Sequence, residues 1–423
     1  MTYYSHYIHT ISMLPMQKFE RRLRIDITYF LSGGLWLISA QGLTIIASLI
    51  STVIFARLLS PTELGVYRYV ISVGSFLSAF SLSGIGQAIL QAGAKGHLGF
   101  FRYSTKPTLI YGFGSSVAAL IAAVYYFYNG NQILMIGCLT IALLQPVSIL
   151  FLNTLAYLYG QQSFRSGTYL QGIKSFVVAA ASIATIYITT DITALLIVYF
   201  TSQAVCGIGS YLWYRPSKAT LQPIESGIQK KYLAFAKHTS VQNIIVGLAT
   251  RLDNIIVFQH LGAASLAHFT IATLLPDQIK GAFKNILTLL IPKYAKHDTI
   301  DTLRAHIPKR SLQFFCILVL ISIGVILITP PLYAFLFPQY PEAILYSQLL
   351  ALSFPAAIYL IPFSVLQSQT KDRTLYHFHT YISIFQIVIT YVLILTHGLI
   401  GAIIARIVTQ YFQCLVVFIL VRR

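Results

Sequence analysis

The sequence predicts an all-α integral membrane protein of about twelve transmembrane helices, arranged as two six-helix lobes. The first observation is composition: 56% of the 423 residues are hydrophobic and only 9% are charged, whereas soluble domains carry about 25% charged residues. The second is that apolar runs long enough to cross a bilayer recur along the whole chain. The third is an internal repeat that divides these runs into two equal sets.

A membrane-spanning helix needs about 20 predominantly apolar residues. This criterion predicts spans near 29–56, 66–94, 108–128, 132–158, 168–189, 192–214, 237–259, 265–291, 310–336, 343–368, 376–396 and 398–420. The expected organisation is an N-terminal cytoplasmic segment at 1–28, an N-lobe at 29–214, a cytoplasmic linker at 215–236 and a C-lobe at 237–423.

The basic residues test this layout, because cytoplasmic loops of membrane proteins carry an excess of Lys and Arg. With twelve spans, 23 of the 29 basic residues, Lys174 among them, fall on the side that holds both termini. The opposite side receives only Arg57 and Arg68. We therefore expect a multi-pass protein of the cell membrane with both termini in the cytoplasm. Topology then explains the net charge of +18, and nucleic acid is not an expected partner.

Two pairs of matching segments indicate the repeat. ARLLSPTELGVY at 56–67 follows the first span and matches FQHLGAASLAHF at 258–269, which follows the seventh, with an offset of 202. Residues 143–165 match 352–373 at offsets of 208 to 209. Because each copy has an even number of spans, both insert the same way round. The repeat is therefore a parallel one, with a pseudo-twofold axis along the membrane normal.

The eighth predicted span, 265–291, carries three charges: Asp277, Lys280 and Lys284. Each costs about 2.5–3.5 kcal/mol at the centre of a lipid-facing helix. At about 100° per residue the three lie on one face of the helix. That face is expected to line a water-filled cavity or a helix interface.

Other spans carry polar groups as well. The seventh holds Arg251 and Asp253, the twelfth holds Arg406 and Gln410, and the second holds Gln87. These groups predict an aqueous path between the lobes. Four intramembrane cations against two carboxylates leave a surplus charge of +2, which suits an anionic ligand.

A structural interpretation remains open for each group. Asp277 and Lys280 are spaced to form an ion pair within one helix. Asp253 is able to neutralise Arg251 or Lys284, and the glutamines of the last span are typical of contacts between membrane helices.

Residues 34–78, GLWLISAQGLTIIASLISTVIFARLLSPTELGVYRYVISVGSFLS, resemble the start of oligosaccharide flippases of the polysaccharide transport family. This family belongs to the multidrug/oligosaccharidyl-lipid/polysaccharide (MOP) exporter superfamily. RLDNIIVFQHLGAASLAHFTIATLLP at 251–276 resembles the opening of the family's second lobe, and HGLIGAIIARIVTQ at 397–410 resembles the start of its last span. The resemblance covers essentially the whole chain.

The resemblance implies a MATE-like, V-shaped, alternating-access transporter that moves undecaprenyl-pyrophosphate-linked oligosaccharide to the outer leaflet for surface polysaccharides such as O-antigen. Helices one, two, seven and eight are expected to border its cavity. The headgroup would then meet Gln41, Gln87, Arg251, Lys280 and Lys284. Asp253 and Asp277 are candidates for coupling to H⁺ or Na⁺ or for counter-ions, and Arg406 and Gln410 are further polar groups within the membrane.

No catalytic residue, metal or cofactor is expected. The expected partners are the lipid-linked glycan, membrane lipids, and the glycosyltransferases and polymerase that act before and after transport; the transporter itself is expected to be a monomer.

Three other functions compete with this one. A MATE-type exporter of cationic drugs would be expected to carry surplus carboxylates in its cavity, and this chain has surplus cations. Peptidoglycan-precursor flippases often carry two additional spans. A membrane enzyme of polysaccharide assembly would need a sizeable outer loop with acidic residues, and the predicted outer connections are short.

Overall fold

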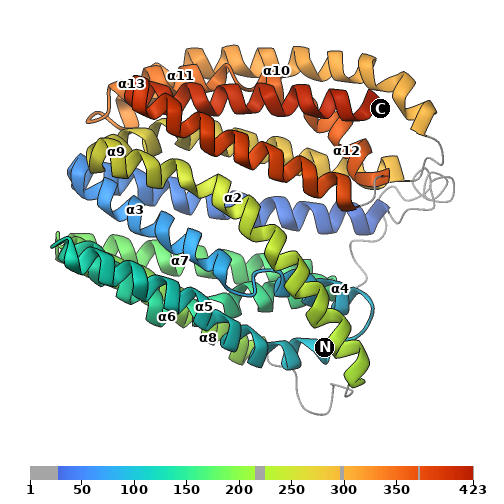
Figure 1. Cartoon of the computed structure of the whole chain (residues 1–423), viewed down its shortest axis with the longest axis horizontal. Helices are drawn as coiled ribbons and strands as arrows, with labels where there is room; N and C mark the ends of the chain where they lie inside the picture. Colours follow the sequence, from blue (N-terminus) through green and yellow to red (C-terminus); the bar gives the residue numbers. More distant parts are fainter. Residues whose placement is uncertain (1–26, 215–223, 296–299, 370–371, 423) are drawn as a thin grey trace, which may run out of the picture.

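The computed structural model describes residues 27–214, 224–295, 300–369 and 372–422, and every regular element in these ranges is a helix (Figure 1). The N-lobe contains α2 (Ile27–Leu58), α3 (Pro61–Leu77), η1 (Ser78–Phe80), α4 (Ile85–Ala94), α5 (Phe100–Tyr128), α6 (Gln132–Gly160), α7 (Phe164–Ile188) and α8 (Ile192–Tyr214). The C-lobe contains α9 (Ser226–Ala295), α10 (Ile300–Leu336), α11 (Glu342–Ala351), η2 (Pro355–Tyr359), α12 (Leu360–Gln369) and α13 (Asp372–Arg422).

The twelve-span prediction agrees with these helices. In the described ranges, nine helices are long and apolar enough to cross a membrane, and the bent pair α3 and α4 makes a tenth span. α9 is interrupted at Gly262 (φ 86°) and α13 at Gly398 (φ 61°), so each of these two helices contains two spans. Backbone at positive φ favours glycine, which has no Cβ. Counting α9 and α13 as two spans each brings the ten spans of the described ranges to the predicted twelve.

The second predicted span, 66–94, is bent instead of straight. α3 and α4 meet at an angle of 62°, with η1 between them. At Gly84 a Cβ would lie 2.4 Å from the carbonyl oxygen of Ala236, so only glycine lets α9 approach the bend this closely.

α9 begins within the expected linker, eleven residues before the predicted start at 237. Residues 215–223 of that linker lie outside the described residues, and the part from Ser226 is helical. This helical part is amphipathic: Lys230 and Lys231 are exposed, whereas Tyr232 is buried against α4 and hydrogen-bonds His97 (Oη to Nδ1, 2.9 Å). The predicted span is shorter than α9 because only the apolar part of the helix, about as long as the hydrocarbon core is thick, is recognisable from hydropathy.

The internal repeat reappears as equal burial at matched positions. Leu64 and Leu266, 202 residues apart, are both 0% exposed, and Tyr67 and Phe269 are 3% and 0% exposed. All four side chains belong to one hydrophobic core that joins the lobes. Both pairs of matched residues are therefore core positions.

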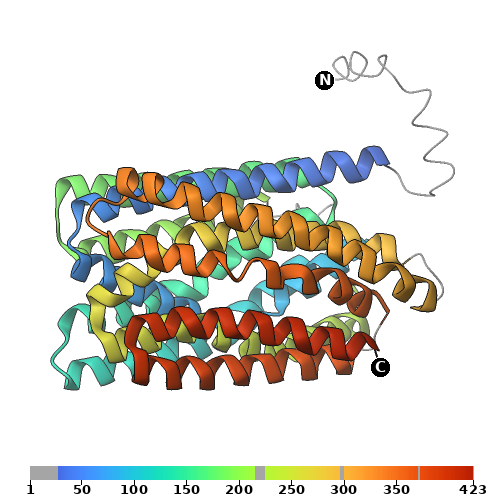
Figure 2. The same cartoon turned by 90° about the horizontal axis from the view of Figure 1, so that it is seen from above.

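The lobes lie side by side, with α5 to α8 on one side and α10 to α13 on the other, and α9 crosses between them (Figures 1 and 2). Near Gly262, Gln259 Nε2 donates to Tyr69 Oη (2.8 Å), and Arg57 Nη2 donates to the Phe335 carbonyl (2.5 Å). Near the start of α9, the Gly84 N–H donates to Ser240 Oγ (2.8 Å). The lobes are thus joined by neutral or singly charged hydrogen bonds at both ends.

The outward-facing surface of the described helices is rich in large apolar side chains. Phe113, Ile121, Leu327 and Phe335 are 66%, 67%, 70% and 73% exposed. An exposed apolar surface of this extent is expected where lipid replaces water as the solvent. The chain is a multi-pass membrane protein.

Candidate functional site

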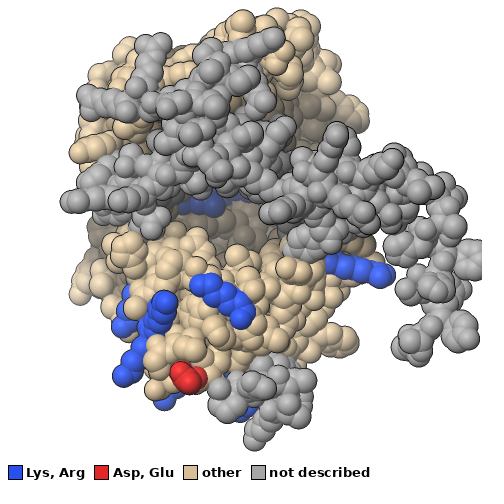
Figure 3. Space-filling view, turned by 90° about the vertical axis from the view of Figure 1, so that its right-hand side faces the viewer, with Lys and Arg blue, Asp and Glu red and all other residues tan. Residues whose placement is uncertain are grey.

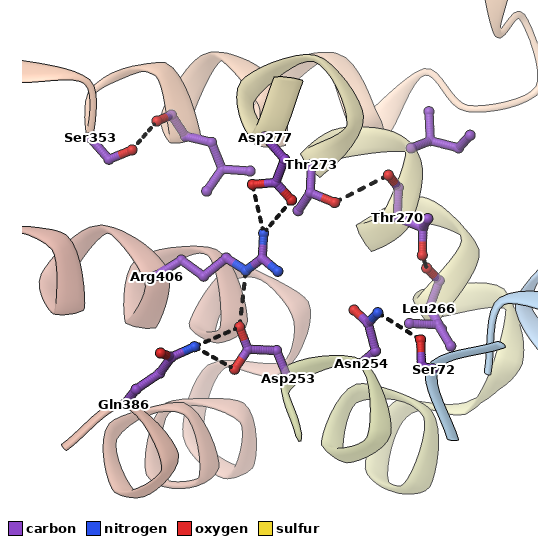
Figure 4. Close-up of polar contacts among 12 residues, drawn as sticks. Ser72, Asp253, Asn254, Leu266, Thr270, Thr273, Asp277, Ser353, Gln386 and Arg406 are labelled. Atoms are coloured by element: carbon purple, nitrogen blue, oxygen red, sulfur yellow. Dashed lines mark hydrogen bonds and ion pairs between the residues drawn. The ribbon is translucent and has the colours of Figure 1, made fainter. Parts of the chain in front are cut away.

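Two aspartates of the C-lobe meet in one network around Arg406 (Figure 4). Arg406 Nε lies 3.0 Å from Asp253 Oδ2, and Arg406 Nη1 lies 3.0 Å from Asp277 Oδ2. The side chain of Asp253 is only 3% exposed and that of Asp277 is 49% exposed. One guanidinium therefore bridges a buried carboxylate and a carboxylate that faces open space.

Asp253 receives further donors from α13. Gln386 Nε2 lies 3.2 Å from each of its carboxylate oxygens, and Thr390 Oγ1 lies 3.4 Å from Oδ1. The guanidinium carbon of Arg406 also lies 4.9 Å from the centre of the buried Phe269 ring. These contacts fix Arg406 and Asp253 in place, because a buried charge is tolerated only when it is paired and hydrogen-bonded.

The network borders a pocket of about 290 Å³, which we call the C-lobe pocket. Its polar lining is Asp253, Asp277, Lys280, Gln386, Arg406, Thr409, Gln410 and Gln413. Two acidic and two basic side chains make its formal charge zero. Of the residues predicted from sequence, Asp253, Asp277, Lys280, Arg406 and Gln410 are brought together here.

The two aspartates have a partner that the sequence did not suggest. The sequence leaves open a pairing of Asp277 with Lys280 and of Asp253 with Arg251 or Lys284. In the structure both carboxylates pair with Arg406 on α13. A pairing between helices more than a hundred residues apart has no signature in helical spacing. Gln386 was also missed, although its place inside an apolar span was a signal.

The other predicted residues lie elsewhere. Gln41 on α2, Gln87 on α4 and Arg251 on α9 are exposed and line neither of the two polar pockets described here. The side chain of Lys284 is outside the described residues.

A second polar pocket, of about 260 Å³, lies in the N-lobe between α2, α3, α7 and α8, and we call it the N-lobe pocket. It is lined by Arg68 and Lys174, which the charge count had assigned to loops on opposite sides. Lys174 lies ten residues into α7, about 15 Å from the helix start at 1.5 Å per residue. Because Lys174 lies inside the predicted span 168–189, the sequence itself indicated a position within the membrane and not in a loop.

Basic side chains are prominent on the end of the molecule that holds the C-terminus. In Figure 3 they are spread over the N-lobe half of this face, and some are visible within the hollow beside the grey atoms. Lys95, Arg102 and Lys106 are exposed on this lobe. Exposed Lys and Arg side chains thus gather on this part of the N-lobe.

In the described ranges, no group of three or more His, Cys, Asp or Glu side chains is arranged to hold a metal ion.

The fold is similar to that of several solved membrane proteins. The lipid II flippase MurJ in an inward closed conformation has 15% sequence identity and a TM-score of 0.69, over 92% of this chain and 87% of that chain. A MATE protein in complex with MaD3S has 14% identity and a TM-score of 0.65, over 93% and 95%. A MOP superfamily transporter from Pyrococcus furiosus, described as having a binding pocket of reverse polarity, has 12% identity and a TM-score of 0.61, over 93% and 94%.

Sequence comparison gives the family. No curated protein matches the chain. The profile of the polysaccharide biosynthesis protein family matches residues 54–320, which is more than half of the sequence. Together with the MATE- and MurJ-like fold, this match shows that the chain belongs to the polysaccharide biosynthesis protein family of membrane proteins.

Proposed function

We propose that the protein flips undecaprenyl-pyrophosphate-linked oligosaccharide from the cytoplasmic to the outer leaflet of the cell membrane, for surface polysaccharides such as O-antigen. The observation that carries the proposal is the position of charge. Ionic and polar side chains gather in pockets inside a bundle whose outer surface is apolar. A pyrophosphate cannot cross hydrocarbon unaided, because moving an unpaired ion out of water is very costly. Family membership and the transporter fold support this function.

The proposed mechanism is alternating access between the N-lobe and the C-lobe. The polar contacts between the lobes are hydrogen bonds such as Asn254 Nδ2 to Ser72 Oγ (2.9 Å) and Gln259 Nε2 to Tyr69 Oη (2.8 Å), beside the hydrophobic core that the lobes share. A neutral hydrogen bond contributes about 0.5–1.5 kcal/mol. Breaking a few of them is within reach of substrate binding.

The headgroup is proposed to travel past the intramembrane cations Arg251, Lys280 and Lys284, with Gln41 and Gln87 beside the path. The pairing of Asp253 and Asp277 with Arg406 supports a counter-ion role for both carboxylates. Asp277, the more exposed of the two, remains the candidate site for a coupled H⁺ or Na⁺. Glycosyltransferases and a polymerase are proposed to act before and after a monomeric transporter.

The test is translocation in proteoliposomes of a fluorescent undecaprenyl-pyrophosphate oligosaccharide. The variants are Lys280→Ala/Lys284→Ala and Arg251→Ala, and the matched control is Arg102→Ala, which removes an exposed cation from α5. We expect wild type and the control to move the lipid, and the other two variants to be at least about tenfold slower, the loss of one charge-assisted contact. Transport of a cationic dye with no movement of the glycolipid would instead favour a drug exporter.

A further inference from the structure

The N-lobe pocket contains two cations and no carboxylate. Its basic residues are Arg68 and Lys174, and none of the described residues that line it is an Asp or a Glu. Hydroxyl and amide groups from α2, α7 and α8 surround them: Thr44, Ser48, Ser51, Thr52, Gln171, Ser175, Ser182 and Gln203. The pocket is therefore polar, positively charged and rich in hydrogen-bond donors.

Arg68 has donors left over. Its Nη2 donates to Thr52 Oγ1 (2.5 Å), while its Nε is excluded from solvent and has no hydrogen-bond partner. Gln171 Oε1 and Ser182 Oγ in the same pocket are also buried without partners. Unpaired buried polar atoms are uncommon in folded proteins, so three of them beside one pocket mark a polar site whose hydrogen bonding the surrounding side chains leave incomplete.

Lys174 is held inside the lobe without a counter-ion. Its Nζ lies 4.3 Å from the centre of the Phe151 ring, and no carboxylate of the described residues forms an ion pair with it. The neighbouring residues Gln171 and Ser175 both contact Thr44 on α2, at 3.3 and 3.2 Å. A lysine fixed at this depth is able to act as a point-charge partner for a phosphate.

An apolar groove meets the N-lobe pocket at Lys174. This groove, of about 390 Å³, lies between α6, α7 and α8, and Lys174 lines both it and the N-lobe pocket. Tyr169, Ile173 and Trp213 line the groove and are 52%, 60% and 83% exposed on the lipid-facing surface. A cationic pocket joined to an apolar groove is complementary to an amphiphile with an anionic head.

We propose that Arg68 and Lys174 bind the phosphate of a polyprenyl phosphate or pyrophosphate lipid, whose prenyl chain lies in the groove between α6, α7 and α8. The phosphate oxygens accept hydrogen bonds from the guanidinium of Arg68 and from Lys174 Nζ, and both cations gain a counter-charge that the described residues lining the pocket do not supply. The C-lobe pocket is less suited to this role, because Arg406 is already paired with Asp253 and Asp277. The identity of the lipid rests on the proposed function; the anion site itself does not.

The test is equilibrium binding to the purified full-length protein in one detergent at fixed concentration, with farnesyl phosphate, farnesol and inorganic pyrophosphate as probes. We expect farnesyl phosphate to bind wild type, inorganic pyrophosphate to bind more weakly, and farnesol not to bind. Lys174→Gln and Arg68→Gln should each weaken farnesyl phosphate by about tenfold or more. Lys174→Arg should retain binding, and Lys106→Gln, which removes an exposed cation from the same lobe, is the matched control.

Gly209→Phe tests the groove separately. Gly209 lines the groove, and a Cβ added there meets nothing within 4 Å, so an aromatic ring is expected to occupy the space of the prenyl chain. This variant should weaken farnesyl phosphate and leave inorganic pyrophosphate unchanged.

Each outcome decides part of the proposal. Equal affinity for farnesyl phosphate and inorganic pyrophosphate, with no effect of Gly209→Phe, would overturn the lipid and leave a site for free phosphate. Unchanged binding in both Lys174→Gln and Arg68→Gln would overturn the site itself. Retained binding with no translocation of the glycolipid would contradict the proposed flippase function while the anion site stands.

Discussion

The N-lobe pocket and the C-lobe pocket occupy equivalent places in the two copies of the repeat but differ in charge. Both are lined by the first, second, fifth and sixth spans of their lobe, and the C-lobe pocket is also lined by the fourth, at Ala357, Tyr359 and Leu360. At the offset of 202, Ser51 of the N-lobe pocket corresponds to Asp253 of the C-lobe pocket. One copy thus places a hydroxyl where the other places a carboxylate. A shared arrangement of spans therefore carries two different chemistries.

The two pockets differ in whether the protein supplies counter-ions for their cations. In the C-lobe pocket Arg406 is neutralised by two aspartates that belong to the protein. In the N-lobe pocket Arg68 and Lys174 have no acidic partner in the pocket lining. In the first arrangement the protein neutralises its own cation, and in the second the proposed lipid phosphate would supply the counter-charge.

Removing Arg406 should have the largest effect on stability. Arg406→Leu leaves Asp253 buried and without its counter-ion, and breaking a buried pair in this way costs about 3–5 kcal/mol. Thermal unfolding in detergent should show a clearly lower midpoint than wild type.

The double variant Asp253→Asn/Arg406→Leu is the control for this prediction. It removes the buried charge together with its partner, so part of the lost stability should return. If Arg406→Leu unfolded at the wild-type temperature, the network would not be a structural clasp.

Changes at the connection between the first two spans of each lobe should have a smaller effect on stability, and the effect should differ between the lobes. In the C-lobe the connection is Gly262 at φ 86° and ψ 177°, a conformation that costs other residues about 1–3 kcal/mol. In the N-lobe the connection is a capping box, in which Glu63 N–H donates to Ser60 Oγ (3.3 Å) and Ser60 N–H donates to Glu63 Oε2 (2.8 Å). Loss of such a cap costs about 1 kcal/mol.

We therefore expect Gly262→Ala to lower the unfolding midpoint more than Ser60→Ala. Equal decreases in the unfolding midpoint would contradict the prediction that the positive φ at Gly262 makes its substitution the more costly of the two.

Neutralising Lys174 should have the smallest effect on stability and the opposite sign to Arg406→Leu. Lys174→Met keeps the apolar stem and removes an unpaired charge from the lobe interior, so stability should be unchanged or higher by about 1 kcal/mol. Unfolding in detergent without added lipid measures it. A loss as large as that of Arg406→Leu would show that Lys174 is a structural charge, and the contrast between the pockets would fail.

The sequence predicted the helical membrane fold, its two lobes and the positions of most spans, because long apolar runs and the repeat are local signals. It did not predict the bend between α3 and α4, which depends on the approach of Ala236 to Gly84. The sequence also indicated Asp253, Asp277, Lys280 and Arg406 as candidate residues. It did not predict which of them pair, because helical spacing carries no information about contacts between distant helices. Arg68 and Lys174 were counted as loop cations although they lie inside the predicted spans 66–94 and 168–189.

Translocation by paired variants measures whether the protein moves an anionic lipid whose phosphate is held by the N-lobe. The measurement is the rate at which fluorescent undecaprenyl-pyrophosphate oligosaccharide crosses proteoliposome membranes that contain wild type, Lys174→Met or Lys106→Gln. The account predicts that wild type and Lys106→Gln transport at similar rates and that Lys174→Met, although folded, is about tenfold slower or more. Wild-type rates no higher than those of protein-free liposomes, or a Lys174→Met variant as fast as wild type, would contradict it.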